Sequence, residues 1–247
     1  SLCYQLPAIV KSGKTFGTTI VVSPLISLMQ DQVEHLLAKI IKASMFSSKG
    51  TAEQRRMTFN LFINGMLELV YISPEMIKAS VQCKKAISKL YQDRKFARIV
   101  VDEAHCVSNW GHDFRPDYKE LSFFKQEYPD IPMIALTATA SEQVRMDIIH
   151  NLQLNNPVFL KQSFNRTILF YQVLKKEKNS IFHMCDMKKT KFKNQTGIIY
   201  CHSKNSCEQT SALMQKNGVK CAFYHAGMDP DERLQVQQDW QADRVQV

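Results

Sequence analysis

Short apolar runs recur along the chain, and segments with helical spacing lie between them. β-Branched runs of this length predict buried strands. The runs lie near residues 19–22, 67–72, 98–101, 132–136, 169–174, 196–200 and 219–223. Because helical segments separate the strands, the pattern predicts an α/β fold with a parallel, doubly wound sheet.

Helix boundaries are clearest where capping residues flank the apolar stripes. Residues 25–40 carry apolar side chains at spacings of three and four, which predicts an amphipathic helix. Ser203 is a good N-cap for a helix that continues to Lys216, and Gly218 would end it. The pair Asp229-Pro230 predicts another helix start, because proline fits the first turn of a helix.

The alternation of strands and helices restarts after residues 162–169, where a new strand follows. At 247 residues and 45% hydrophobic, the chain can bury one large core or two modest ones. We therefore expect two domains, comprising residues 1–161 and 162–247.

Composition and charge narrow the range of functions. The net charge of +9 suits a polyanionic partner without proving one. Much of the charge comes from lysines within residues 175–193, which form either a DNA-contacting patch or, as we favour, a solvated surface. The seven cysteines are odd in number and scattered, which favours reduced thiols. No apolar run approaches the roughly 20 residues of a membrane span, so no membrane partner is expected.

Two adjacent carboxylates, Asp102 and Glu103, directly follow the strand predicted at 98–101. In an open α/β sheet, ligands bind outside the carboxyl ends of the strands. An Asp there can hold Mg²⁺ on the phosphates of a nucleotide, and a neighbouring acid can orient or deprotonate the attacking water. Taken alone, the quartet D-E-A-H is also compatible with a strand that ends in a polar turn.

The loop that follows mixes aromatic residues, an arginine and turn formers. Trp110, Phe114 and Arg115 within residues 106–118 can stack bases and grip phosphate close to a nucleotide site. The alternative is a surface loop with its one tryptophan packed into the core.

From Asp102 to Tyr118 the sequence DEAHCVSNWGHDFRPDY resembles motif II and the adjoining aromatic-rich loop of the RecQ family of DNA helicases. The pattern is most similar to that of the Bloom-syndrome-type eukaryotic members. Other segments follow in the family's order. They are 22–33 (motif Ia), 71–75 (motif Ib), 135–140 (motif III), 163–166 (the start of the second domain), 197–201 (motif IV) and 224–227 (the segment after it). Their order and spacing together make the resemblance specific, and it runs along the whole chain.

The sequence departs from the family pattern at a few positions. Asn109 stands where a glutamine is usual, and Thr167-Ile168 stands where Pro-Asn is expected. Lys204 stands where the family often has arginine, and lysine cannot make the same planar fork of hydrogen bonds.

The resemblance also bears on the two ends of the chain. In this family the segment that begins at Ser1 follows directly on a Gly-Lys pair, so Ser1 would be the last residue of the phosphate loop. We therefore expect an internal fragment with two RecA-like parallel-sheet lobes in tandem, both truncated. The first would lack its opening strand and phosphate loop, and the second its C-terminal part. Without the family's arginine finger, which is worth roughly 10³–10⁵ in turnover, such a chain would be a poor ATPase by itself.

Residues 8–15, AIVKSGKT, loosely fit a relaxed phosphate-loop pattern. A working loop follows a strand and opens a helix, whereas here a helix precedes and a strand follows. We therefore expect an ordinary turn between helix and strand.

The resemblance implies roles for the residues around the two carboxylates. Ser1 and Asp102 would hold Mg²⁺ with ATP, and Glu103 would activate the hydrolytic water. His105, Thr137 and Thr139 would connect the state of the nucleotide to the interface between the lobes. The Thr-Ala-Thr segment could equally be an ordinary helix cap.

The resemblance also implies contacts with DNA. Trp110, Phe114 and Arg115 would contact single-stranded DNA and make hydrolysis depend on it. The turns Ser23-Pro24 and Ser73-Pro74 would follow the DNA backbone, although a simple capping role is as plausible for either turn. Arg166 would help the two lobes close.

The function that the resemblance implies is an ATP-dependent 3′→5′ DNA helicase in recombination and repair. It would use ATP and Mg²⁺ and act in the nucleus on single-stranded and branched DNA, with a type I topoisomerase and repair proteins as partners. A catalytically dead DNA-binding scaffold, made from a truncated helicase gene, is the alternative. An RNA helicase of a related family is a further alternative, against which the loop at 110–118 argues.

Overall fold

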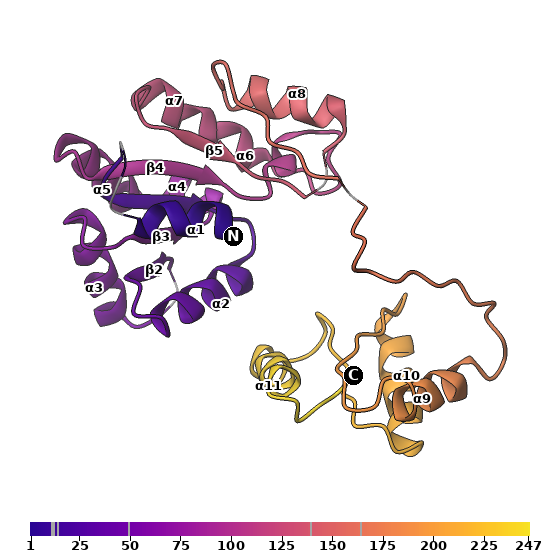
Figure 1. The fold of residues 1–247 in the computed structure, drawn as a ribbon. Coiled ribbons are helices and arrows are strands. Elements are labelled where there is room, and N and C mark those ends of the chain that lie inside the picture. Colours follow the sequence, from indigo (N-terminus) through magenta and orange to yellow (C-terminus); the bar gives the residue numbers. More distant parts are fainter. Residues whose placement is uncertain (11–12, 14, 49, 139, 164) are drawn as a thin grey trace. The chain divides into compact units, whose positions relative to one another are not determined.

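The computed structural model describes residues 1–247 except 11–12, 14, 49, 139 and 164. The chain forms two compact units, Ser1–Lys161 and Gln162–Val247 (Figure 1). Among the described residues, no helix is long and apolar enough to cross a membrane.

The first unit is built on a five-stranded parallel sheet with the order β2-β3-β1-β4-β5. The strands are β1 (Thr18–Val22), β2 (Ala43–Phe46), β3 (Leu69–Ile72), β4 (Phe96–Val101) and β5 (Met133–Ala135). Every residue of the central strands β1 and β4 is buried, as expected for a sheet covered on both faces. The predictions of strands at 19–22, 67–72, 98–101 and 132–136 are confirmed. The prediction missed β2, whose two middle residues are only half-buried.

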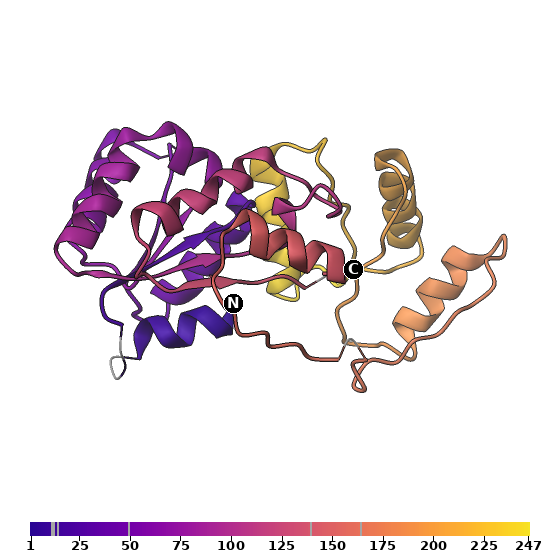
Figure 2. The ribbon, with the colours of Figure 1, turned by 90° about the horizontal axis from the view of Figure 1, so that it is seen from above.

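Helices cover both faces of this sheet (Figure 2). They are α1 (Leu2–Ile9), α2 (Ile26–Leu37), α3 (Ala52–Ile63), α4 (Pro74–Ala79), α5 (Val81–Gln92), α6 (Pro116–Lys119), α7 (Phe123–Glu127) and α8 (Glu142–Asn151), with 3-10 turns at Ala104–Val107 and Glu120–Ser122. Alternate residues of β1 enter different clusters. Ile20 packs with α3, α5 and α8, whereas Val21 packs with α1 and α2. The predicted doubly wound arrangement is therefore present in this unit.

The helix predicted at 25–40 is shorter in the structure and ends at Leu37. Ile40 has a φ of +61° and is 92% exposed. The Ile41 amide donates to the Leu36 carbonyl at 3.0 Å, which closes the helix end. The prediction extended too far because the apolar stripe in the sequence continues to Ile40. The backbone leaves the helical conformation before that residue.

Residues 8–15 include the last two residues of a helix and part of the connection to the following strand. Helix α1 ends at Ile9 and β1 begins at Thr18, which is the reverse of the order around a working phosphate loop. Residues 11, 12 and 14 of this segment lie outside the described residues.

The second unit contains the helices α9 (Ser180–Lys189), α10 (Lys204–Lys216) and α11 (Pro230–Gln241). The predicted caps are confirmed. The Ser203 hydroxyl accepts from the Ser206 amide at 3.1 Å, and a carboxylate oxygen of Asp229 accepts from the Asp231 amide at 2.9 Å. Gly218, with a φ of +75°, ends α10 as predicted.

The strands predicted at 169–174, 196–200 and 219–223 are wrong for the described part of this unit, where these segments have irregular backbone. Among the described residues, a few backbone hydrogen bonds link two of these segments to the C-terminal residues. They are Gly197 N–H to the Gln246 carbonyl at 2.8 Å, Ala222 N–H to the Val247 carbonyl at 3.0 Å and Gln246 N–H to the Lys220 carbonyl at 2.8 Å. An apolar run supplies side chains for a core, but a strand also needs a neighbour that pairs with consecutive backbone groups.

Candidate functional site

Several of the predicted site residues of the first unit lie where its parallel strands end. Backbone hydrogen bonds hold these ends together: Asp102 N–H to the Val22 carbonyl at 2.9 Å, and Ala104 N–H to the Leu136 carbonyl at 2.8 Å. The segments at this edge are Ser23-Pro24 after β1, Ser73-Pro74 after β3, Asp102-Glu103 after β4 and Leu136-Thr137 after β5. Residues far apart in the sequence therefore share one edge of the sheet.

The two carboxylates lie in a tight, fixed turn. Asp102 accepts a hydrogen bond from the Glu103 amide at 3.1 Å, and Glu103 has a left-handed backbone with a φ of +49°. This conformation is costly for residues other than glycine, and such strain is concentrated at functional sites. The hydroxyl of the buried Tyr118 donates to the Asp102 carbonyl at 2.9 Å, which holds the backbone at the end of β4.

Tyr4, on α1, is a neighbour of Asp102 that the sequence did not reveal. Burial raises the pKa of Tyr4, and the charges of Tyr71 and Asp102 raise it further. Tyr4 therefore stays protonated beside the carboxylate. Gln5 donates to the Tyr71 hydroxyl at 3.3 Å, so the first turns of α1 reach this part of the site. Ser1 is exposed at the N-cap of the same helix, and its side chain makes no capping hydrogen bond.

His105 connects two strand ends. Its Nδ1 lies 3.1 Å from the Thr137 hydroxyl and 3.2 Å from a Glu103 carboxylate oxygen, and its ring stacks on His112 at 4.0 Å. Burial lowers the pKa of His105, and the nearby His112 lowers it further, against the opposing charges of Glu103 and Asp113. Thr139, which is predicted to act together with Thr137, lies outside the described residues.

The aromatic loop presents its tryptophan to solvent. Trp110 is 76% exposed, so the alternative of a tryptophan packed into the core is wrong. Phe114 is partly exposed, and the Lys119 ammonium lies 5.1 Å from the centre of its ring. The Arg115 guanidinium donates to the Pro24 carbonyl at 3.1 Å and to Asp113 at 3.1 Å. The loop is therefore tied directly to the turn that follows β1.

The two Ser-Pro turns differ in what their hydroxyls do. The Ser73 hydroxyl accepts from the Met76 amide at 3.3 Å and caps α4, so the capping role is real for this residue. The Ser23 hydroxyl is buried and makes no hydrogen bond with any described residue. A buried polar group of this kind requires a partner.

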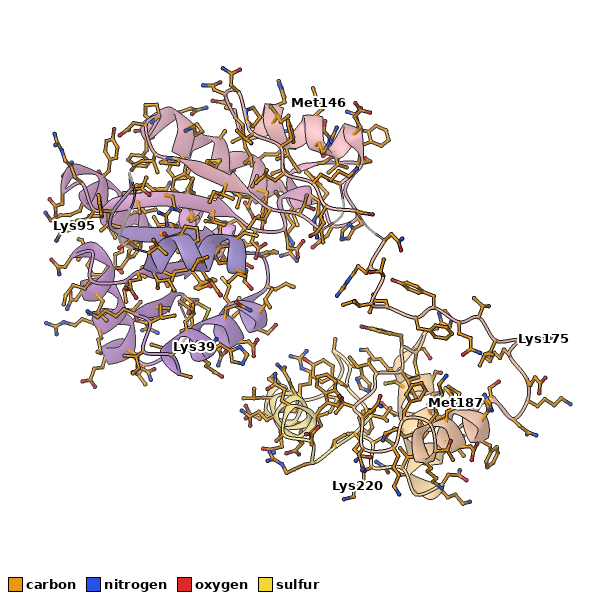
Figure 3. The ribbon with its side chains drawn as sticks, in the orientation of Figure 1. Lys39, Lys95, Met146, Lys175, Met187 and Lys220 are labelled. Carbon is orange, nitrogen blue, oxygen red and sulfur yellow. The ribbon has the colours of Figure 1, made fainter. Side chains whose placement is uncertain are left out.

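The remaining predicted groups belong to the second unit. Arg166 is exposed, and its carbonyl accepts from the Leu169 amide at 2.9 Å. The lysines of 175–193 are exposed apart from Lys188. Lys175 lies exposed in an irregular segment (Figure 3), whereas Lys188 is buried and donates to the Gln246 side chain at 3.0 Å.

Family comparisons agree with this architecture. The DEAD/DEAH box helicase family model matches residues 1–147, and the helicase conserved C-terminal domain model matches residues 170–247. The chain belongs to the DEAD/DEAH box helicase family.

Similar sequences confirm the resemblance to the RecQ branch of this helicase family. The chain is 82% identical over 247 residues to the ATP-dependent helicase SGS1 of Saccharomyces cerevisiae. It is 42% identical over 251 residues to the ATP-dependent DNA helicase RecQ of Haemophilus influenzae, and 41% identical over 243 residues to the RecQ-like DNA helicase BLM of Xenopus laevis. The alignments cover 100%, 100% and 97% of this chain, but only 17%, 38% and 18% of those relatives.

Solved structures of other helicases show the same fold. The DUF1998 helicase MrfA, bound to DNA and AMPPNP, matches with a TM-score of 0.68 and 19% identity over 99% of this chain and 37% of that one. Dbp5 of Saccharomyces cerevisiae, bound to RNA and ADP BeF3, matches with a TM-score of 0.64 and 16% identity over 100% of this chain and 61% of that one. The two RecA-like lobes predicted from the sequence agree with these matches.

The lowered pKa of His105 predicts how the stability of the fold changes at acid pH. Because its pKa in the folded chain lies below the unfolded value of about 6.5, the neutral ring stabilises the fold above that pH. This contribution is lost as the pH falls through 6.5 toward the folded value. An NMR titration without magnesium and nucleotide should show His105 changing charge below pH 6.5.

Replacing Glu103 with Gln should lower the His105 pKa further, since the Glu103 charge raises it. A His105 ring that titrates at 6.5 or above would contradict the environment described for it.

Proposed function

We propose that this chain is the two-lobed motor of an ATP-dependent DNA helicase of the RecQ type. The observation that carries the proposal is the direct connection between the carboxylates of Asp102-Glu103 and an exposed aromatic loop. The connection runs along the chain and through the contact of Arg115 with the Pro24 carbonyl. Such a connection can make ATP hydrolysis depend on DNA. The names of the relatives support a DNA rather than an RNA substrate.

The residues at the strand ends fit ATP with Mg²⁺. Magnesium commonly uses one or two carboxylates together with phosphate oxygens and water, so it does not need a cluster of acids. Groups of three or more potential metal ligands are absent from the described residues, and a half-buried Asp102 at a strand end suits this sparser kind of site. In the proposal Asp102 and the Ser1 hydroxyl hold the ion, which neutralises charge on the phosphates. The unpaired Ser23 hydroxyl supplies a further donor at the same edge.

Glu103 is the proposed base for the hydrolytic water. Its carboxylate is partly exposed and within 3.2 Å of His105 Nδ1, so it is both reachable and oriented. His105 in turn contacts Thr137, and we propose that this pair, with Thr139, reports the state of the nucleotide to the segment after β5.

The DNA side of the proposal uses exposed and backbone groups. Bases would stack on Trp110 and Phe114, with Arg115 holding the loop at the site. The turns Ser23-Pro24 and Ser73-Pro74 would follow the phosphate backbone, and Arg166 would help the lobes close.

The similarity to RecQ-type relatives supports finer features of the whole protein. These are 3′→5′ movement, a role in recombination and repair, and location in the nucleus. Branched DNA, a type I topoisomerase and repair proteins would be its partners.

The role of Glu103 is tested by Glu103→Gln in the whole protein. Loss of a general base removes a contribution of roughly 10²–10⁴ to the rate, while the phosphate-binding groups remain. ATP hydrolysis should therefore fall by this factor, and binding of a fluorescent ATP analogue should persist. Glu127→Gln, an exposed acid at the end of α7, is the matched control and should hydrolyse ATP normally. Hydrolysis near the wild-type rate in the first variant would remove Glu103 from the mechanism.

The DNA role of the loop is tested by Trp110→Ala in the same protein. Stacking on an aromatic side chain is worth about 1–3 kcal/mol per base, so the single-stranded DNA concentration for half-maximal stimulation should rise about 5- to 150-fold. Phe182→Ala removes an exposed aromatic ring from α9 and serves as the control. Equal stimulation of both variants at low DNA concentration would exclude Trp110 from the DNA contact.

A further inference from the structure

Helix α8 holds the backbone of the aromatic loop through a hydroxyl relay. Ser108 is completely buried, and its hydroxyl donates to a carboxylate oxygen of Asp147 on α8 at 2.5 Å. The same hydroxyl oxygen accepts a hydrogen bond from the Trp110 amide at 3.1 Å. Three residues from two distant segments therefore form one continuous chain of hydrogen bonds.

The direction of these bonds is fixed by the number of protons. A serine hydroxyl has one proton, and a carboxylate can only accept, so the Ser108 proton points to Asp147. The Ser108 lone pairs then face the Trp110 amide. A hydroxyl bonded to a carboxylate at this distance is a strong, charge-assisted contact. Asp147 therefore orients the acceptor that Trp110 uses.

The surroundings of the relay keep it in one geometry. Gln143 donates to the second carboxylate oxygen of Asp147 at 3.2 Å, and Val144 and Ile148 bury the inner face of α8 in the core. On the loop side, the Gly111 amide donates to the Ser108 carbonyl at 3.0 Å. A Cβ atom at Gly111 would lie 2.3 Å from the His105 carbonyl oxygen, so the turn is packed without space to relax.

We infer that Asp147 is a positioning residue that presets the exposed Trp110 ring for stacking on a base. This inference rests on the proposed function, in which Trp110 contacts DNA. A ring on a fixed backbone loses less conformational freedom when it binds than a ring on a mobile loop. Asp147 acts on Trp110 through Ser108, with which it makes a hydrogen bond.

Amide hydrogen exchange in the whole protein tests the relay without any DNA. Asp147→Ala should make the Trp110 amide exchange roughly tenfold faster, because the acceptor loses its orientation. Ser108→Ala should do the same, and Asp147→Asn, which keeps an oxygen acceptor, should fall between these variants and the wild type. Met146→Ala, at the exposed neighbouring position of α8 (Figure 3), is the control and should leave the exchange rate unchanged. Unchanged exchange in both Asp147→Ala and Ser108→Ala would overturn the inference.

DNA-stimulated ATP hydrolysis then separates positioning from a general loss of structure. Asp147→Ala should raise the DNA concentration for half-maximal stimulation several-fold, about three- to tenfold by the strength of one hydrogen bond, and hydrolysis without DNA should stay the same. If ATP hydrolysis fell by the same factor with and without DNA, Asp147 would have a merely structural role and the inference would be overturned.

Trp110→Ala distinguishes this inference from the proposed function. If Trp110→Ala leaves DNA stimulation intact, the proposed role of the loop fails, and so does the positioning role that rests on it. If Trp110→Ala weakens stimulation and Asp147→Ala does not, the proposed function stands and the inference alone fails.

Discussion

The parallel pairing of β4 with both β1 and β5 is the constraint on which the site depends. Parallel neighbours end at the same edge, so the acids after β4 lie between the turns after β1 and β5. The hydrogen bond from the Asp102 amide to the Val22 carbonyl extends this pairing by one residue beyond β4. Without this parallel pairing, the two carboxylates, the Ser23 hydroxyl and Thr137 would not be held at fixed positions relative to one another. Complete burial of β1 and β4 makes their pairing rigid.

From this edge the chain leads without a break to the loop that we propose contacts DNA. Glu103 turns the backbone in a left-handed conformation. Arg115 and Tyr118 then bind the C-terminal end of the following loop to the ends of β1 and β4. Asp147 adds a third attachment from α8. In our proposal, a displacement of any of these strand ends on nucleotide binding is passed to Trp110 through these hydrogen bonds.

The sequence was most informative where structure depends on local chemistry. The cap at Ser203 and the place of Asp102 at the end of a strand follow from a few adjacent residues, and both predictions are confirmed. The strand predicted at 196–200 failed because strand formation needs a pairing partner elsewhere in the chain. Tyr4 and Asp147 were missed for the same reason, since each reaches the site through contacts with residues far away in the sequence. Long-range contacts of this kind have no marker in a single sequence.

The central claim, that nucleotide and DNA sites are coupled, is tested most directly by reciprocal binding measurements in the whole protein. The Kd for single-stranded DNA is measured with and without a non-hydrolysable ATP analogue, and the Kd for the analogue with and without DNA. Coupling requires the same factor in both directions, and typical couplings lie at about 5–150-fold. An equal change in both affinities would support the account. Affinities that do not respond to the other ligand would contradict it.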